Sequence, residues 1–197
     1  VLVPPGDPPA LERVVVDLVR ARFPDHNILA EEGSEPDRSS EYTWVVDPLD
    51  GTNNYARGIP LFTSSVAVAK NGKLIAAAVY DPSRDELFRA HRGGGASVNG
   101  TPLQVRQSTD LSDAILATGF YYNRGREMEQ TLETIREFFH RGGIGIRRTG
   151  SAALDLCYVA AGRYDGFWEH NLGLWDYAGG SLILEEAGGR LSDNRGE

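Results

Sequence analysis

The chain is organised around one short run, Trp44-Val45-Val46-Asp47-Pro48-Leu49-Asp50-Gly51-Thr52. Residues 43–46 are largely apolar and predict a buried strand. Pro48 fixes its own φ and biases Asp47 toward an extended conformation, so we expect the strand to end at this corner. Asp50 is a favourable N-cap and predicts a helix that begins at the two residues after it.

Two carboxylates, a hydroxyl and free helix N–H groups therefore meet at one strand-to-helix corner. Hard divalent cations prefer carboxylate oxygens, and helix N-termini bind phosphate through their N–H groups. Gly51 also lets a ligand approach the backbone. The corner predicts a metal-assisted phosphate site. For an isolated motif of this kind, a plain strand end at Asp47 and a plain helix cap at Asp50 stay open as the alternative.

Composition excludes several classes of protein. A chain of 197 residues can bury a real core as one domain or two small ones. Its formal net charge of −8 and the lack of a basic run argue against a nucleic-acid partner. The same charge disfavours an anionic substrate unless bound cations reverse the local field. The single cysteine, Cys157, fits a cytoplasmic protein, and no run approaches the roughly 18 apolar residues of a membrane span.

Hydrophobic periodicity predicts a mixed order of helices and strands. We expect helices over residues 10–22, 127–139, 150–161 and 176–186, and strands over 28–30, 43–46, 62–70, 73–80, 86–90, 114–118, 144–146 and 165–168. Asn71-Gly72 predicts a two-residue hairpin turn within an antiparallel meander. A boundary near residues 107–111 would separate an α+β half, 1–108, which carries the metal and phosphate corner, from an α/β half, 109–197, which supplies Asp176 and substrate contacts.

Further acidic residues stand at predicted element ends. Glu31-Glu32 follows the strand over 28–30, and Asp176 opens the last helix. Taken singly, paired acids at a strand end are usually solvated and Asp176 is most often a helix cap. A carboxylate at the start of an apolar helix is harder to dismiss, because it cannot simply face water when buried. As a set, these carboxylates match a two- or three-metal phosphate site.

Three motifs occur in order along the chain: Glu31-Glu32, Asp47-Pro48-Leu49-Asp50-Gly51-Thr52 and Trp175-Asp176-Tyr177-Ala178-Gly179-Gly180. Together they resemble the inositol monophosphatase family of Mg²⁺-dependent, lithium-sensitive sugar phosphatases. The resemblance covers essentially the whole chain and includes Arg147-Arg148-Thr149-Gly150-Ser151-Ala152-Ala153. It implies an α+β fold with layers in the order αβαβα and antiparallel or mixed sheets. We also expect a homodimer.

The resemblance implies which residues bind metal. Glu31 and Asp47, with the backbone carbonyl of Leu49, would hold a first Mg²⁺. Asp47, Asp50 and Asp176 would hold a second. Glu31 and Glu32 would help to position a third, largely hydrated ion.

The resemblance also implies contacts to substrate. The N–H groups of Gly51 and Thr52 would bind phosphate oxygens, and Thr52 would orient the attacking water, so the expected catalytic residues are Thr52, Glu31 and Asp47. Ala152 and Glu169 match positions that contact sugar hydroxyls, with an exposed loop acid as the alternative for Glu169. Three predicted helix starts, at Gly51, Gly150 and Asp176, would converge on the site and add positive dipole ends.

Two departures from the family pattern stand out. Family members carry an Asp before the first helix that supports the catalytic threonine. Here the matching position is Pro8, with Asp7 one residue early, so either Asp7 substitutes for it or Thr52 has lost its partner. Judged against the family's usual extent, we also expect the chain to lack a first helix and a last strand and helix.

The motifs together predict a Mg²⁺-dependent phosphomonoesterase for inositol monophosphate or a related small sugar or polyol phosphate. Fructose-1,6-bisphosphatase, histidinol-phosphatase and phosphoadenosine-phosphate phosphatase activities stay open, because relatives with the same metal motifs catalyse them. A non-catalytic binding or regulatory protein that keeps the fold is the alternative from a different class.

Overall fold

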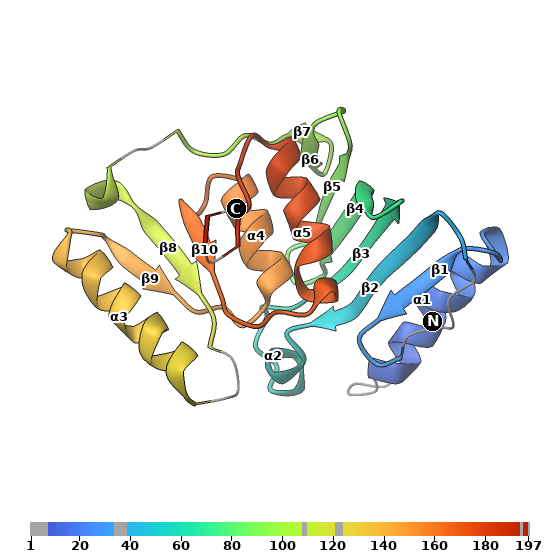
Figure 1. The fold of residues 1–197 in the computed structure, drawn as a ribbon, viewed down its shortest axis with the longest axis horizontal. Coiled ribbons are helices and arrows are strands. Elements are labelled where there is room, and N and C mark those ends of the chain that lie inside the picture. The colour runs from blue at the N-terminus through green and yellow to red at the C-terminus, as the bar shows by residue number, and fades with distance from the viewer. Residues whose placement is uncertain (1–7, 34–38, 108–109, 121–123, 194, 197) are drawn as a thin grey trace.

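The computed structural model describes residues 8–33, 39–107, 110–120, 124–193 and 195–196. In these residues, helices and sheets alternate in five layers (Figure 1). The order is α1 (Pro8–Arg22), a large sheet, the pair α4 (Ala152–Ala160) and α5 (Leu174–Glu186), a small sheet, and α3 (Arg126–His140). The predicted αβαβα arrangement is confirmed. None of the helices described here combines the length and apolarity needed to cross a membrane.

The large sheet pairs its strands in chain order from β1 to β7. Its members are β1 (Asn27–Ala30), β2 (Tyr42–Asp50), β3 (Thr63–Lys70), β4 (Lys73–Asp81), β5 (Glu86–His91), β6 (Ala96–Val98) and β7 (Thr101–Pro102). The pair β1–β2 is parallel and the remaining pairs are antiparallel. Asn71 and Gly72 have φ of 50° and 75°, as a primed two-residue turn requires. The predicted meander is confirmed, and the short strands β6 and β7 extend it.

The small sheet is parallel, with β8 (Ile115–Thr118) between β10 (Gly166–Trp168) and β9 (Gly145–Arg147). The 3-10 turn η1 (Leu111–Asp113) precedes it. Helices α4 and α5 belong to this half of the sequence, yet their side chains share one core with Val45, Val79 and Phe88 of the large sheet. The division at residues 108 and 109 falls outside the described residues, and the two-half organisation stays a prediction.

Helix α5 is buried on nearly all sides over residues 178–184, as its sequence predicts. Two glycines make this possible. A Cβ at Gly179 would lie 2.4 Å from Ser65 Oγ of β3, and a Cβ at Gly180 would lie 2.6 Å from Leu156 Cβ of α4. Because Gly179 and Gly180 have no side chains, α5 can contact strand β3 on one side and helix α4 on the other.

The corner after β2 differs from the prediction. Strand β2 does not end at Asp47 but continues to Asp50, with an irregular register between these residues. Asp47 pairs with Ser65 and Asp50 with Thr63, so one extra residue accommodates Pro48, which has no N–H to donate. The N-cap of α2 (Thr52–Ala56) is Gly51, and it makes no side-chain cap. The prediction that Asp50 caps this helix is wrong.

Two further helix predictions need correction. Asp176 is the third residue of α5, whose N-cap is Gly173. In α3, the helical spacing of Met128, Leu132, Ile135 and Phe139 predicts one apolar, inward face. Leu132 and Phe139 are instead 46% and 48% exposed, while Phe138 is buried. The ring of Phe138 occupies the space beside Gly143, where a Cβ would lie 2.1 Å from it. The helix therefore turns Phe138 inward rather than its neighbour.

Candidate active site

Glu31 and Asp47 lie side by side because their strands are parallel and in register. Ala30 pairs with Val46, so the next residue of each chain segment leaves the same edge of the sheet. Asp47 is buried and Glu31 is exposed, and Asp47 lowers the pKa of Glu31 while the charge of Glu31 raises that of Asp47. Asp47 Oδ1 also accepts from the Leu49 amide at 2.9 Å. The next residue, Glu32, is exposed, and its amide donates to Glu12 Oε2 of α1 at 2.9 Å.

Asp176 reaches the same edge through the packing of α5. Gly179 lies against Ser65, which is the cross-strand partner of Asp47. Asp176 is three residues, about one turn, before Gly179 and therefore lies toward the end of β2. Its Oδ2 accepts from the Gly173 amide at 2.6 Å, and its charge raises the pKa of both Glu31 and Asp47.

Asp50 points toward α4 rather than along α2. Its Oδ2 accepts from the Ser151 hydroxyl at 2.6 Å and from the Ala153 amide at 2.7 Å. The amide of Ala152 also lowers the pKa of this carboxyl. Asp50 thus caps a helix that lies far from it in the sequence.

The turn after Asp50 requires glycine. Gly51 has φ of 93°, and a Cβ there would lie 2.9 Å from the Leu61 carbonyl oxygen. Thr52 is exposed, and its hydroxyl donates to the Leu49 carbonyl at 3.0 Å. The hydroxyl expected to orient water therefore lies beside the carbonyl expected to bind metal. The predicted partner Asp7 and the side chain of Pro8 lie outside the described residues.

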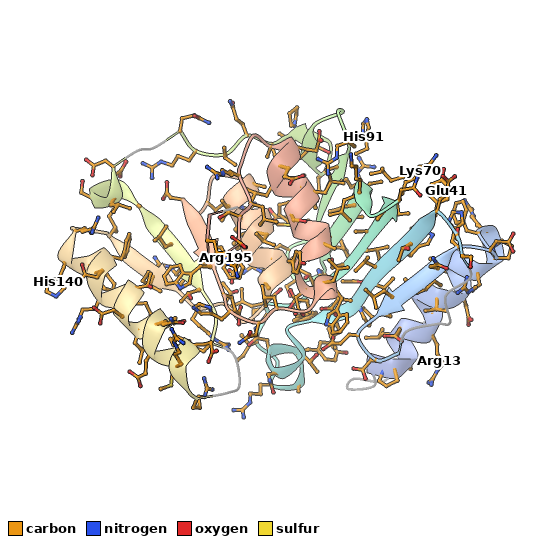
Figure 2. The ribbon with its side chains drawn as sticks, in the orientation of Figure 1. Arg13, Glu41, Lys70, His91, His140 and Arg195 are labelled. Carbon is orange, nitrogen blue, oxygen red and sulfur yellow. The ribbon has the colours of Figure 1, made fainter. Side chains whose placement is uncertain are left out.

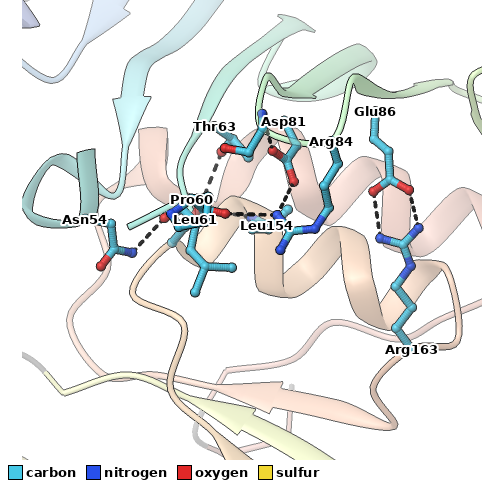
Figure 3. Close-up of polar contacts among 11 residues, drawn as sticks. Asn54, Pro60, Leu61, Thr63, Asp81, Arg84, Glu86, Leu154 and Arg163 are labelled. Carbon is cyan, nitrogen blue, oxygen red and sulfur yellow. Dashed lines mark hydrogen bonds and ion pairs between the residues drawn. The ribbon is translucent and has the colours of Figure 1, made fainter. Parts of the chain in front are cut away.

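The sequence pattern did not identify Asn54 as a residue that holds the candidate site together. This buried side chain donates from Nδ2 to the Leu61 carbonyl at 2.6 Å (Figure 3) and to the Thr149 carbonyl at 2.8 Å. Arg84 holds the same loop, donating to the Pro60 carbonyl while it pairs with buried Asp81. An Asn in a short helix carries no signal of its own, because its partners are backbone atoms brought close by folding.

Negative charge accumulates where these segments meet. Burial, followed by the charges of Asp50 and Glu31, raises the pKa of Asp47 to about 9. Burial also raises the pKa of Asp50 to about 7, although hydrogen bonds from Ser151 and Ala153 oppose it. Desolvation first, and then Asp176 and Glu32, raise the pKa of Glu31, and burial raises that of Asp176. A divalent cation would relieve this repulsion.

The donor chemistry fits Mg²⁺, which prefers carboxylate and carbonyl oxygens. In the part of the chain that the structure describes, however, no three His, Cys, Asp or Glu side chains form a finished coordination group. The labelled His140 lies at the left end of the molecule and His91 at its upper edge, so the two are far apart (Figure 2). Among the described residues, the candidate site is thus a set of neighbouring carboxylates that are not arranged around one common point.

The predicted substrate contacts lie on the α4 and β10 side. Ala152 is the first residue of α4 and is buried. Burial raises the pKa of Glu169 to about 7, against the opposing effect of Arg148, and Asp176 raises it further. The carboxylate of Glu169 lies directly over Gly119, where a Cβ would be 1.9 Å from Oε2. Glu169 is therefore within electrostatic reach of Asp176, and its contact with a sugar stays a prediction.

The three predicted helix starts do gather. Asp50 and Asn54, which flank the start of α2, both hydrogen-bond to the start of α4. Asp176 at the start of α5 is close enough to raise the pKa of Asp50.

A separate apolar groove of about 680 Å³ lies behind this corner, between α1 and the Pro48-Leu49 turn, and contains none of the predicted acidic ligands.

Comparisons with known proteins agree with this geometry. Residues 9–197 match the model of the inositol monophosphatase family. The Nus factor SuhB of Escherichia coli is 45% identical over 188 residues, which are 95% of this chain and 70% of that protein. The crystal structure of the extragenic suppressor protein suhB from Bartonella henselae has a TM-score of 0.91 at 42% identity, covering 96% of this chain and 72% of that one.

An inositol monophosphatase structure from Anabaena (Nostoc) has a TM-score of 0.86 at 43% identity, covering 92% of this chain and 72% of that one. The chain therefore belongs to the inositol monophosphatase family.

Proposed function

We propose that the protein is a Mg²⁺-dependent phosphomonoesterase that hydrolyses inositol monophosphate or a related sugar or polyol phosphate. One observation supports this most strongly. Glu31, Asp47, Asp50 and Asp176 come from three distant segments, and yet the charge of Asp176 raises the pKa of each of the other three at one edge of the sheet. A protein has little reason to bury Asp47 and Asp50 beside other carboxylates unless they receive a cation.

The residues would divide the work as the resemblance implies. Glu31, Asp47, Asp50, Asp176 and the Leu49 carbonyl would hold Mg²⁺, with Glu32 near a hydrated ion. When bound, Mg²⁺ neutralises phosphate charge and lowers the pKa of coordinated water. The amides of Gly51 and Thr52 would hold phosphate oxygens, and the amino end of α4 adds positive potential.

Positioning would supply most of the remaining rate enhancement, since phosphoryl transfer asks little covalent chemistry of the protein. The Thr52 hydroxyl would orient the attacking water in line with the ester oxygen. Glu169 and the Ala152 amide would orient the sugar. Among substrates, Glu169 favours a polyol phosphate, while fructose-1,6-bisphosphate, histidinol phosphate and phosphoadenosine phosphate remain candidates.

A direct assay tests this proposal. Purified protein is incubated with inositol 1-phosphate and each alternative ester, and phosphate release is followed with Mg²⁺ and with excess EDTA. We expect release with Mg²⁺, loss of it with EDTA and recovery when Mg²⁺ is restored. No release from any of these esters by a folded protein would count against a phosphatase.

A regulatory, non-catalytic role is the second candidate, and the names of relatives favour it. The Escherichia coli relative is named a Nus factor, which is a factor name and not an enzyme name. Such a role would need a macromolecular partner. If that partner is a nucleic acid, this role conflicts with the prediction from net charge that the protein binds none.

Complementation separates the two roles. An Escherichia coli strain lacking its own Nus factor SuhB receives this chain, either unchanged or as Asp47→Asn. If restoration requires Asp47, the catalytic role is favoured. Equal restoration by both chains, with hydrolysis lost in the variant, favours the regulatory role.

Three finer expectations accompany the phosphatase proposal. Lithium should inhibit hydrolysis, sedimentation should give the mass of a homodimer, and fractionation should find the protein in the cytoplasm. Each has its own measurement, and failure of one leaves the others standing.

A further inference from the structure

The Asp50 carboxylate is shared between the proposed cation site and the amino end of α4. Its Oδ2 accepts from the Ser151 hydroxyl and the Ala153 amide at 2.6 and 2.7 Å. These two donors hold that oxygen at the start of α4, and the Ala152 amide also lowers the pKa of this carboxyl. Asp50 is 7% exposed, so water has little access to replace either donor.

Ser151 lies at the centre of this arrangement. Its Oγ is 3.4 Å from the Leu154 amide, which donates to it, and 3.4 Å from Thr63 Oγ1. A serine hydroxyl has one proton to donate. Because that proton is directed to Asp50 at the shortest of these distances, Thr63 and Leu154 act as the donors to Ser151.

A second bridge joins the same two segments. Asn54, on the far side of Gly51 from Asp50, donates to the Thr149 carbonyl at 2.8 Å. The β2–α2 corner thus holds the start of α4 on both sides of the Gly51 turn. A displacement of the Asp50 carboxylate is transmitted directly to Ser151 and Ala153.

We propose that Ser151 is a positioning residue of the cation site, and that its hydroxyl fixes the orientation of the Asp50 carboxylate, so that cation binding is coupled to the amino end of α4. This inference rests on the proposed function, because it assumes that Asp50 is a ligand. Ser151 itself would contact neither cation nor substrate. Groups that orient a metal ligand typically contribute tenfold to a hundredfold in metal affinity.

Calorimetric titration of Mg²⁺ into the substrate-free protein tests the inference. We expect Ser151→Ala to weaken Mg²⁺ binding at least about tenfold, and Ser151→Thr, which keeps a hydroxyl, to restore most of the affinity. Ser151→Cys is a second variant of similar shape with a weak donor, and it should behave like Ser151→Ala. Circular dichroism confirms that each variant is folded.

Ser181→Ala is the matched control. Ser181 is also buried, and its hydroxyl donates to the Ala178 carbonyl within α5 at 3.0 Å. Loss of this hydroxyl should leave Mg²⁺ affinity unchanged. It measures what removal of any buried serine hydroxyl does to the protein.

Amide hydrogen exchange tests the coupling itself. In the wild-type protein, Mg²⁺ should slow exchange of the amides over residues 152–155, although none of these residues is a proposed ligand. In Ser151→Ala this Mg²⁺-dependent protection should disappear. A merely structural serine would change exchange equally with and without the cation.

The outcomes separate the inference from the proposed function. Unchanged Mg²⁺ affinity in folded Ser151→Ala and Ser151→Cys, or an equal loss in Ser181→Ala, overturns the role of Ser151. Wild-type protein that binds Mg²⁺ but hydrolyses no ester overturns the phosphatase, while the affinity comparison still decides the inference. Wild-type protein that binds no Mg²⁺ overturns both.

Discussion

Two of the regions that supply carboxylates to the candidate site are placed by different forces. At the β2–α2 corner, Asp47 and Asp50 are three residues apart, so the chain itself keeps them together. Asp176 lies far away in the sequence and reaches the corner because Gly179 lets α5 approach β3. Sequence spacing is therefore direct evidence that Asp47 and Asp50 lie together, whereas the position of Asp176 depends on helix packing.

The two regions also differ in electrostatic strain. Asp47 is 1% exposed, and the charges of Asp50 and Glu31 raise its pKa. Asp176 is partly exposed, and burial alone raises its pKa. Loss of charge should therefore have its largest functional effect at the corner. Changes in packing should have their clearest effect at α5.

The largest expected effect comes from Asp47→Asn. It removes charge from the carboxylate that faces Glu31, Asp50 and Asp176. We expect turnover of inositol 1-phosphate to fall more than about a hundredfold. The metal-free protein should stay folded, because asparagine is neutral, as the Asp47 carboxyl is below its raised pKa of about 9. Phosphate release measures this. Glu133→Gln is the control, because Glu133 lies in an exposed ion pair on α3. An unaffected rate in Asp47→Asn would show that Asp47 is not part of the proposed site.

Gly51→Ala should have the next largest effect, on stability. The new Cβ meets the Leu61 carbonyl at 2.9 Å, and φ of 93° is unfavourable for alanine. Together these should cost about 3 kcal/mol in the free energy of unfolding. Urea denaturation measures it.

Gly72→Ala is the matched control for that substitution. Gly72 has φ of 75° with no atom near its Cβ position, so only the backbone term of about 1 kcal/mol applies. An equal loss in both variants would show that close approach at Gly51 contributes nothing.

Gly179→Ala should cost about 1–2 kcal/mol, because helical backbone favours alanine while the Cβ meets Ser65 Oγ at 2.4 Å. It should also weaken Mg²⁺ binding by displacing Asp176. Adding Ser65→Ala removes the clashing oxygen and should recover most of both losses. If the double variant recovers neither, Gly179 does not position α5 in this way.

Asp155→Asn should have the smallest effect near pH 5. Asp155 lies in α4 with 1% exposure, and one carboxyl oxygen, Oδ1, has no hydrogen-bond partner. Burial raises its pKa from 3.8 to about 8, partly opposed by a hydrogen bond from Thr149. Between these values the folded state binds a proton that the unfolded state has released, so wild-type stability falls as pH rises.

The asparagine variant lacks this proton uptake. We expect stability within about 1 kcal/mol of wild type near pH 5, and a variant that becomes relatively more stable as pH rises toward 8. Denaturant unfolding at several pH values, compared as the difference between the two proteins, isolates this group from other carboxyls. A constant difference across pH would mean that Asp155 is ionised in the folded protein.

Local features of the fold were predictable where neighbouring residues specify them. The Asn71-Gly72 turn sets the hairpin between β3 and β4. The inward face of α3 was not predictable, since Phe138 and Phe139 are adjacent and the space beside Gly143 selects one of them.

In the candidate site, too, some features follow from neighbouring residues and others only from contacts between distant segments. The acidic residues Glu31, Asp47, Asp50 and Asp176 stood out in the sequence by residue type and by motif. The use of Asp50 as a cap for α4, and the bridge from Asn54, could not be read there, because both join backbone atoms about a hundred residues away.

The sequence by itself determined the family, the meander and which carboxylates are candidates for one site, since periodicity, turn residues and motifs are local properties. Tertiary structure alone decided that β2 continues through Pro48 to Asp50, that Asp50 turns to α4, and that Asp176 approaches Asp47. The physical reason is that these placements depend on close contacts between segments distant in the chain, at glycines whose missing Cβ matters only once a partner is packed against them.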